Sequence, residues 1–177
     1  RAIDDAVIRI HSTDLGKTEE IKDLEALFNF TTDLSLLHAA LVASGIVPPS
    51  FEGRKDITLQ EILEKLVGKG KGFELVTRVS TQNWRIPKGS GLAVSTMLLA
   101  TMNMALTKFT GQLGVTPEEI KAITEDDKML VVARTTLAEW LGGSGGGWQD
   151  AGGMWPGIKQ IIGQEARPGD PEYGVTP

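Results

Sequence analysis

Three stretches of the chain carry patterns that are typical of β-strands. Residues 6–11 alternate and are rich in β-branched side chains, and residues 73–79 alternate apolar with polar positions. Residues 154–162 are also expected to form a strand, bent near Pro156 and Gly157. The patterns therefore predict strands in the first half of the chain and one near its end.

Two helices are predicted between the first two of these strands. Residues 34–46 are apolar on nearly all sides, which indicates a buried helix that ends near Gly45. Thr58 and Glu61 have the spacing of a capping box, and the apolar positions that follow share one face. This second helix is expected to end at about Val67.

Two further helices are predicted in the second half. Residues 92–106 are rich in Leu, Met and Ala, which indicates a central buried helix. Thr116 is followed by Pro and two Glu residues, a strong start signal for a helix that runs to Leu141 and stops at Gly142. Strands and helices are mixed without strict alternation, so the expected fold class is α+β.

Composition narrows the function classes. The 177 residues include 18 Lys plus Arg against 23 Asp plus Glu, a net charge of −5 that argues against a general nucleic-acid binder. Cysteine is absent, which excludes disulfides and thiolate metal sites, and two His leave little material for zinc. No apolar run approaches the roughly 20 residues that span a bilayer, and no signal peptide is visible, so a cytoplasmic chain with a trimmed N-terminus is expected.

Glycine-rich segments hold the candidate chemistry. The first, residues 86–96, lies between a predicted strand and a buried helix and contains three hydroxyl side chains. Free amides at a helix start, with small residues before them, bind phosphate, although an ordinary glycine-rich turn is an equal alternative. The second, residues 145–153, presents Asp150, which is suited to act as a general base or simply to cap a turn.

Several strings in the chain resemble the GHMP kinases. Gly89-Ser-Gly-Leu-Ala-Val-Ser-Thr is similar to their second signature, and Gly145-Gly-Gly-Trp-Gln-Asp resembles the catalytic loop of the L-fucose kinase branch. His11-Ser-Thr-Asp-Leu-Gly and Leu34-Ser-Leu-Leu-His-Ala-Ala-Leu are similar to that branch too. The resemblance runs through residues 7–162 and implies a two-layer βαβ domain of the ribosomal-protein-like type.

The resemblance also implies an activity and its residues. The expected reaction is ATP-dependent phosphorylation of a sugar hydroxyl, most simply the anomeric hydroxyl of L-fucose, with ATP and Mg²⁺ as the small molecules bound. Asp150 matches the catalytic aspartate, and Ser95 and Glu139 match the magnesium site, with a solvated helix charge as the alternative for Glu139. The implied phosphate-binding residues are Lys88, Gly89, Ser90, Gly91, Leu92, Ala93, Ser95 and Thr96, and the implied substrate loop is Gly146, Gly147, Trp148, Gln149 and Asp150.

Departures from the family pattern keep alternatives open. Ala93 stands where the family usually has glycine, Val94 where Ser or Thr is common, and Ala151 where Gln often follows the aspartate. A catalytically impaired binding relative and a heptose phosphate kinase therefore remain alternatives. The family's N-terminal sugar signature and its C-terminal domain are not seen, so residues 1–163 are expected to be part of a kinase domain and residues 164–177 a tail. Self-association of such a partial chain is expected as well, with neither nucleic acid nor membrane as a partner.

Overall fold

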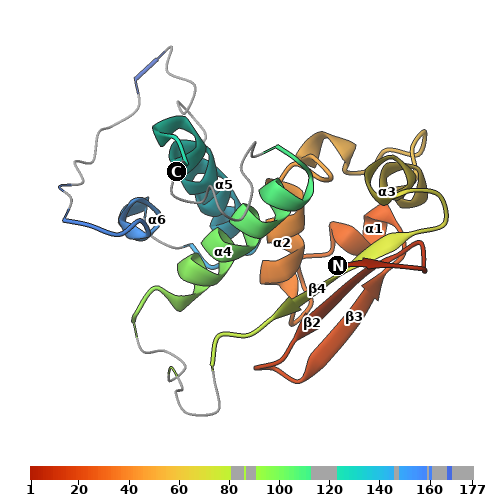
Figure 1. Ribbon diagram of the computed structural model, residues 1–177, viewed down its shortest axis with the longest axis horizontal. Coiled ribbons are helices and arrows are strands. Elements are labelled where there is room, and N and C mark those ends of the chain that lie inside the picture. The colour runs from red at the N-terminus through yellow and green to blue at the C-terminus, as the bar shows by residue number, and fades with distance from the viewer. Residues whose placement is uncertain are drawn as a thin grey trace.

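The computed structural model describes residues 1–80, 86, 91–112, 123–145, 148–158, 160 and 167–168. Within these residues the chain combines a small sheet with a group of helices (Figure 1). In chain order the elements are β1 (Ala2–Ile3), β2 (Ile8–Ser12), β3 (Lys17–Ile21), α1 (Leu24–Leu27), α2 (Ser35–Ala43), a 3-10 turn (Pro49–Phe51), α3 (Leu59–Val67), β4 (Gly72–Thr77), α4 (Val94–Phe109), α5 (Glu125–Leu141) and α6 (Trp148–Gly153).

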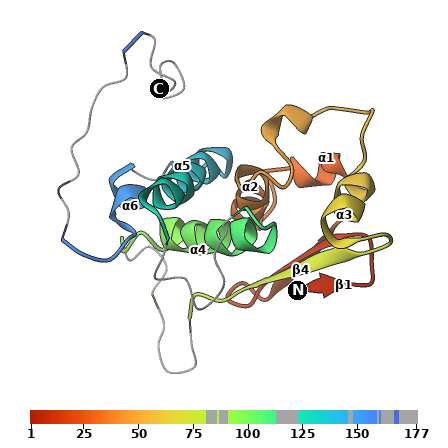
Figure 2. The same ribbon diagram turned by 45° about the horizontal axis from the view of Figure 1, so that its top comes forward.

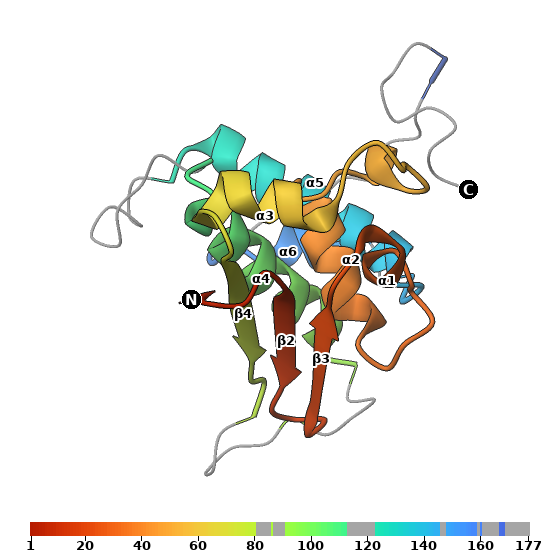
Figure 3. The ribbon, with the colours of Figure 1, turned by 90° about the vertical axis from the view of Figure 1, so that its right-hand side faces the viewer.

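The sheet has four strands in the order β1-β4-β2-β3. β2 and β3 form an antiparallel hairpin, whereas β2 and β4 are parallel and pair from Ile8 with Phe73 to Ser12 with Thr77. β4, β2 and β3 lie side by side in Figure 3. Because β2 and β4 are parallel, both end at the same edge of the sheet, and the segment that leads into α4 leaves from that edge.

The helices lie on one side of the sheet, which gives the layered arrangement seen in Figure 2. α2 and α4 contact each other, and α5 contacts both of them. The predicted α+β class is confirmed in these general terms.

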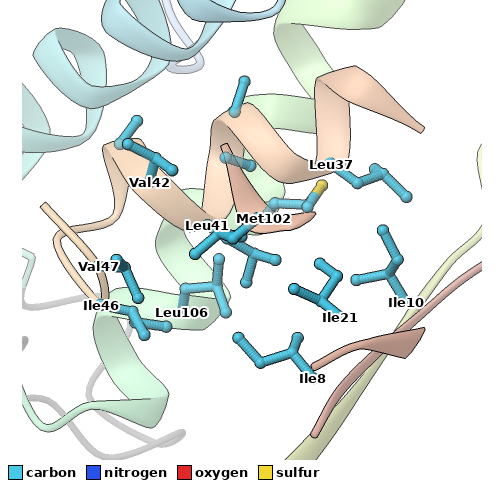
Figure 4. Close-up of a cluster of buried hydrophobic side chains, with 14 of the residues drawn as sticks. Ile8, Ile10, Ile21, Leu37, Leu41, Val42, Ile46, Val47, Met102 and Leu106 are labelled. Carbon is cyan, nitrogen blue, oxygen red and sulfur yellow. The ribbon is translucent and has the colours of Figure 1, made fainter. Parts of the chain in front are cut away.

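The core is formed where the sheet faces α2 and α4. Ile8, Ile10 and Ile21 point from the strands toward Leu41 of α2 and Met102 of α4 (Figure 4). The three Ile side chains are fully buried, and burial of such a side chain contributes about 1.5–3 kcal/mol relative to exposure. The alternating pattern of residues 6–11 therefore reflects this contact, since every second side chain of β2 points into the core.

Two predicted helices are confirmed, with ends within three residues of those expected. α2 ends at Ala43, and Gly45 follows in the left-handed conformation (φ 81°). α3 starts with the expected capping box, in which Thr58 accepts from the amide of Glu61 and the Glu61 carboxylate accepts from the amide of Thr58. Its predicted apolar face is buried against the core.

Two predictions about elements are wrong, and one strand was missed. β3 was not expected, because its sequence Lys-Thr-Glu-Glu-Ile is mostly polar; it pairs with β2 and buries only Ile21. Residues 154–158 form turns rather than a strand, since the chain bends at Pro156 and at Gly157 (φ 115°). A continuous helix from Thr116 to Leu141 is excluded because Thr124 is extended (φ −70°, ψ 163°) and caps a new helix, α5; Thr116 itself lies outside the described residues.

Candidate functional site

The start of α4 has an unusual backbone. Ala93, the residue before the first helical position, adopts the left-handed conformation (φ 50°, ψ 37°), and Gly91 does the same at φ 68°. A Cβ atom makes this conformation costly, so glycine is favoured there. Ala93 stands where the resemblance implies glycine. It therefore carries a side chain in a backbone conformation that favours glycine.

The first turn of α4 contacts a carboxylate from α5. The Thr96 hydroxyl donates to Oε1 of Glu139 at 2.5 Å, and the Ser95 hydroxyl donates to the same oxygen at 3.2 Å. Glu139 is only 1% exposed, so the alternative of a solvated helix charge is wrong. Its other oxygen, Oε2, is buried and has no hydrogen-bond partner among the described residues.

The chain turns sharply at the end of α5. Gly142 approaches α2 so closely that a Cβ there would lie 3.2 Å from Leu36, and Gly143 takes a positive φ of 70°. The main-chain carbonyl of Glu139 then accepts from both the amide and the hydroxyl of Ser144, at 3.0 and 3.1 Å. The predicted stop at Gly142 is confirmed, and the turn leads the chain back toward α4.

Asp150 lies in a short helix rather than in a loop. The expected glycine-rich loop gives way at Trp148 to α6, and Asp150 occupies the first turn of this helix, half-buried. α6 contacts both α4 and α5, and Ala151 is buried in this packing. The element that carries Asp150 is thus held against the two helices that carry Ser95, Thr96 and Glu139.

The structure describes part of the predicted site. Lys88, Gly89, Ser90, Gly146 and Gly147 lie outside the described residues, as does the side chain of Trp148. Gly91 and Leu92 are exposed ahead of α4, and Gln149 is exposed on α6.

The sequence did not reveal that Thr96 belongs to a row of buried polar residues between α4 and α5. Thr96, Asn103 and Thr107 line one face of α4, and the Thr107 hydroxyl accepts from the Arg134 guanidinium at 2.8 Å. The spacing of seven and then four residues was visible within the apolar segment and marks one side of a helix. The Leu, Met and Ala content of the segment obscured this signal.

A separate hollow lies at the β2–β3 turn. Its volume is about 420 Å³, and an ion pair between Lys17 and Asp33 lies along its wall. None of the predicted site residues lines it. Nearby, His38 is buried, as expected for a packing residue, with Nδ1 3.0 Å from the carbonyl of Leu27 and Nε2 3.3 Å from Glu19 without hydrogen-bond geometry.

The arrangement at α4 is suited to bind an anion together with a cation. The free amides and positive dipole end of a 16-residue helix favour a phosphate, and the buried Oε2 of Glu139 offers a ligand to a cation. Among the described residues, no group of three or more His, Asp or Glu side chains gathers that could hold a metal ion. Oxygens of a bound molecule are suited to complete the ligands of a cation at Glu139. No helix in the described part of the chain is long and apolar enough to cross a membrane.

Two curated proteins are similar to the chain. It is 30% identical over 158 residues to an L-fucokinase/L-fucose-1-P guanylyltransferase of Bacteroides fragilis, an alignment that covers 87% of the chain and 14% of that protein. It is 28% identical over 152 residues to a bifunctional fucokinase/GDP-fucose pyrophosphorylase of Arabidopsis thaliana, covering 82% of the chain and 11% of the relative. No protein-family model and no solved structure matches the chain. The chain thus spans about one seventh or less of these relatives, and the similarity supports a fucokinase-like relationship.

Proposed function

We propose that the chain forms part of a sugar kinase that transfers the γ-phosphoryl group of ATP to the anomeric hydroxyl of L-fucose or a similar sugar. The observation that carries the proposal is the buried Glu139 carboxylate, hydrogen-bonded to Ser95 and Thr96 at the start of α4. The fucokinase names of the two similar proteins support the same reaction class, and so does the resemblance of residues 89–96 to a GHMP signature.

The residues present fit a magnesium ion bound together with nucleotide phosphates. Mg²⁺ in such sites is held by one or two carboxylates and by phosphate oxygens, which agrees with a single carboxylate oxygen left without a partner among the described residues. Glu139 and Ser95 are the side chains that would hold it. Bound there, the ion would supply neutralisation of negative charge on the phosphates.

The start of α4 would bind the phosphates themselves. The amides of the first helical turn have no acceptor within the helix, and the helix dipole places about half a positive charge at this end. The preceding residues, Gly91 and Ala93, both have a positive φ, so the backbone turns just before these amides. Phosphoryl transfer depends mainly on positioning and charge stabilisation, which this helix end is suited to supply.

Asp150 would act on the sugar. From the first turn of α6 its carboxylate would accept the proton of the attacking hydroxyl, or orient that hydroxyl toward the γ-phosphorus. The packing of α6 against α4 and α5 supports this role, because it holds the helix that carries Asp150 against the proposed phosphate-binding helix α4.

The role of Asp150 is tested with the Asp150→Asn variant of the full-length gene product. We expect turnover to fall about 100-fold or more, because general-base catalysis is lost, while the dissociation constant for Mg-ATP stays close to that of the wild type. Sugar-dependent ADP release and nucleotide binding measure the two quantities. Asp126→Asn, in the exposed first turn of α5, is the matched control and is expected to leave both unchanged. Turnover near the wild-type rate in Asp150→Asn would exclude the proposed role.

A further inference from the structure

The hydroxyl of Thr96 is buried and already has a partner. Thr96 is 1% exposed, and its hydroxyl lies 2.5 Å from Oε1 of Glu139, the distance of a hydrogen bond to a carboxylate. Its single donor is therefore used inside the protein. Although the signature motif places Thr96 among the phosphate-binding residues, this hydroxyl faces α5.

Ser95 and Thr96 contact Glu139 in different ways. The Ser95 hydroxyl is only partly buried, and its hydrogen bond to the same Oε1 atom is longer, at 3.2 Å. Ser95 can exchange this contact for a ligand at low cost, whereas Thr96 is β-branched, fully buried and restricted in χ1. Ser95 is therefore suited to exchange its contact for a ligand, whereas Thr96 is suited to hold Glu139 in place.

Glu139 is a buried carboxylate without a positively charged partner in the described part of the chain. Removing a carboxylate from water is costly unless hydrogen bonds or a counter-charge compensate for the loss. The two hydroxyls compensate one oxygen only, and Oε2 has no hydrogen-bond partner among the residues that the structure describes. The side chain is thus held in place through one oxygen, while the other oxygen is buried without a hydrogen-bond partner among the described residues.

We propose that Thr96 is a positioning residue: its hydroxyl holds Oε1 of Glu139 so that Oε2 is presented to the cation that accompanies the nucleotide. This inference rests on the proposed function and adds a residue to its metal-binding site. Thr96 would act through Glu139, as residues behind a metal ligand commonly do, and their replacement costs about 10–100-fold in metal affinity.

The test uses the full-length protein with ADP and Mn²⁺, a paramagnetic probe whose binding is measured by electron paramagnetic resonance without turnover. Thr96→Val keeps the shape but removes the donor, and we expect the Mn²⁺ dissociation constant to rise about tenfold or more. Thr96→Ser restores a hydroxyl and is expected to restore most of the affinity. Thr135→Val is the matched control, because Thr135 is a buried residue of α5 whose hydroxyl donates only to the carbonyl of Val131; it is expected to leave Mn²⁺ binding unchanged.

Coupling to Glu139 gives a second measure. In a Glu139→Gln background, Thr96→Val is expected to cause no further loss of Mn²⁺ affinity, because the carboxylate that Thr96 positions is no longer there to bind the ion. Equal Mn²⁺ affinity of Thr96→Val and the wild type, or equal losses in both backgrounds, would overturn the positioning role and leave the proposed function intact. Absence of Mn²⁺–ADP binding by the folded wild-type protein would instead overturn the proposed function and this inference with it. Should Thr96→Val fail to fold, Thr96→Cys, a weaker donor of similar size, replaces it in the same comparison.

Discussion

Asp14 joins the β2–β3 turn to the end of β4. Its two carboxylate oxygens accept hydrogen bonds from the amides of Val79 and Ser80, at 2.6 and 2.9 Å. Burial raises the pKa of Asp14, but the hydrogen bonds from these amides together outweigh it and hold the pKa below its ordinary value of 3.8. Because Val79 and Ser80 precede the glycine-rich segment in the sequence, Asp14 anchors the chain just before the candidate phosphate-binding residues.

Asp14→Ala is therefore expected to lower the free energy of unfolding by about 1 kcal/mol at pH 7, the net value of a lost hydrogen-bonded contact at an exposed position. The folded-state pKa is depressed, so the contribution is complete above the unfolded-state value of 3.8 and disappears as the pH falls through the folded-state pKa. Urea unfolding at several pH values measures this. A difference between the two proteins that persists unchanged below pH 3.8 would contradict the assignment.

At single positions, the sequence indicated which residues are candidates for the site, but not which side chains contact one another. The resemblance marked Ser95 and Glu139 together, and the structure shows them in contact across 44 residues of chain. Neither pattern nor spacing indicated that Thr96 shares this carboxylate. A contact between distant segments depends on how two helices pack, and periodicity within one helix does not determine that.

Among the elements, the start of α4 allows a specific prediction about stability. Ala93→Gly is expected to raise the free energy of unfolding by about 1 kcal/mol, because glycine relieves the cost of a left-handed residue that carries a Cβ. Ala105→Gly, at an exposed interior position of the same helix, is the matched control and is expected to lower it by about 1 kcal/mol. Changes of opposite sign in the free energy of unfolding, measured by chemical denaturation, would support backbone strain at Ala93. A loss of stability in both variants would contradict it.

Elements with strong end signals were predicted well, and elements defined by partners were not. α3 has both a capping box and an amphipathic face, and its predicted bounds agree with the structure. β3 exists because it pairs with β2, and α6 because it packs against α4 and α5, so neither has a strong local pattern. The start of α5 was misplaced because Thr124 and Asp127 form a second capping box that competes with the signal at Thr116.

For the whole molecule, local patterns predicted a mixed α+β chain, but they did not predict the strand order. The parallel pairing of β2 with β4 joins segments more than 60 residues apart, and it is stabilised by the shared core rather than by any local signal. This pairing brings the ends of both strands to the same edge of the sheet, near the beginning of α4.

Self-association of the chain stays a prediction. Apolar side chains on α4 and α5 are partly open to solvent, among them Met97 at 45% and Met129 at 65%. Association would remove such exposed apolar side chains from water. Sedimentation velocity of the 177-residue chain over a range of concentrations is expected to show species larger than 19.0 kDa. A single monomeric species at all concentrations would contradict it.

The most direct test of the central claim is ADP release by the full-length gene product with Mg-ATP and a panel of L-fucose, D-arabinose, mannose, galactose and a heptose phosphate. We predict ADP release that depends on the sugar, is fastest with L-fucose and is lost in Glu139→Gln, because this buried carboxylate of α5, beside the start of α4, is the proposed metal ligand. A folded protein that binds nucleotide but releases no ADP with any sugar of the panel would contradict the account.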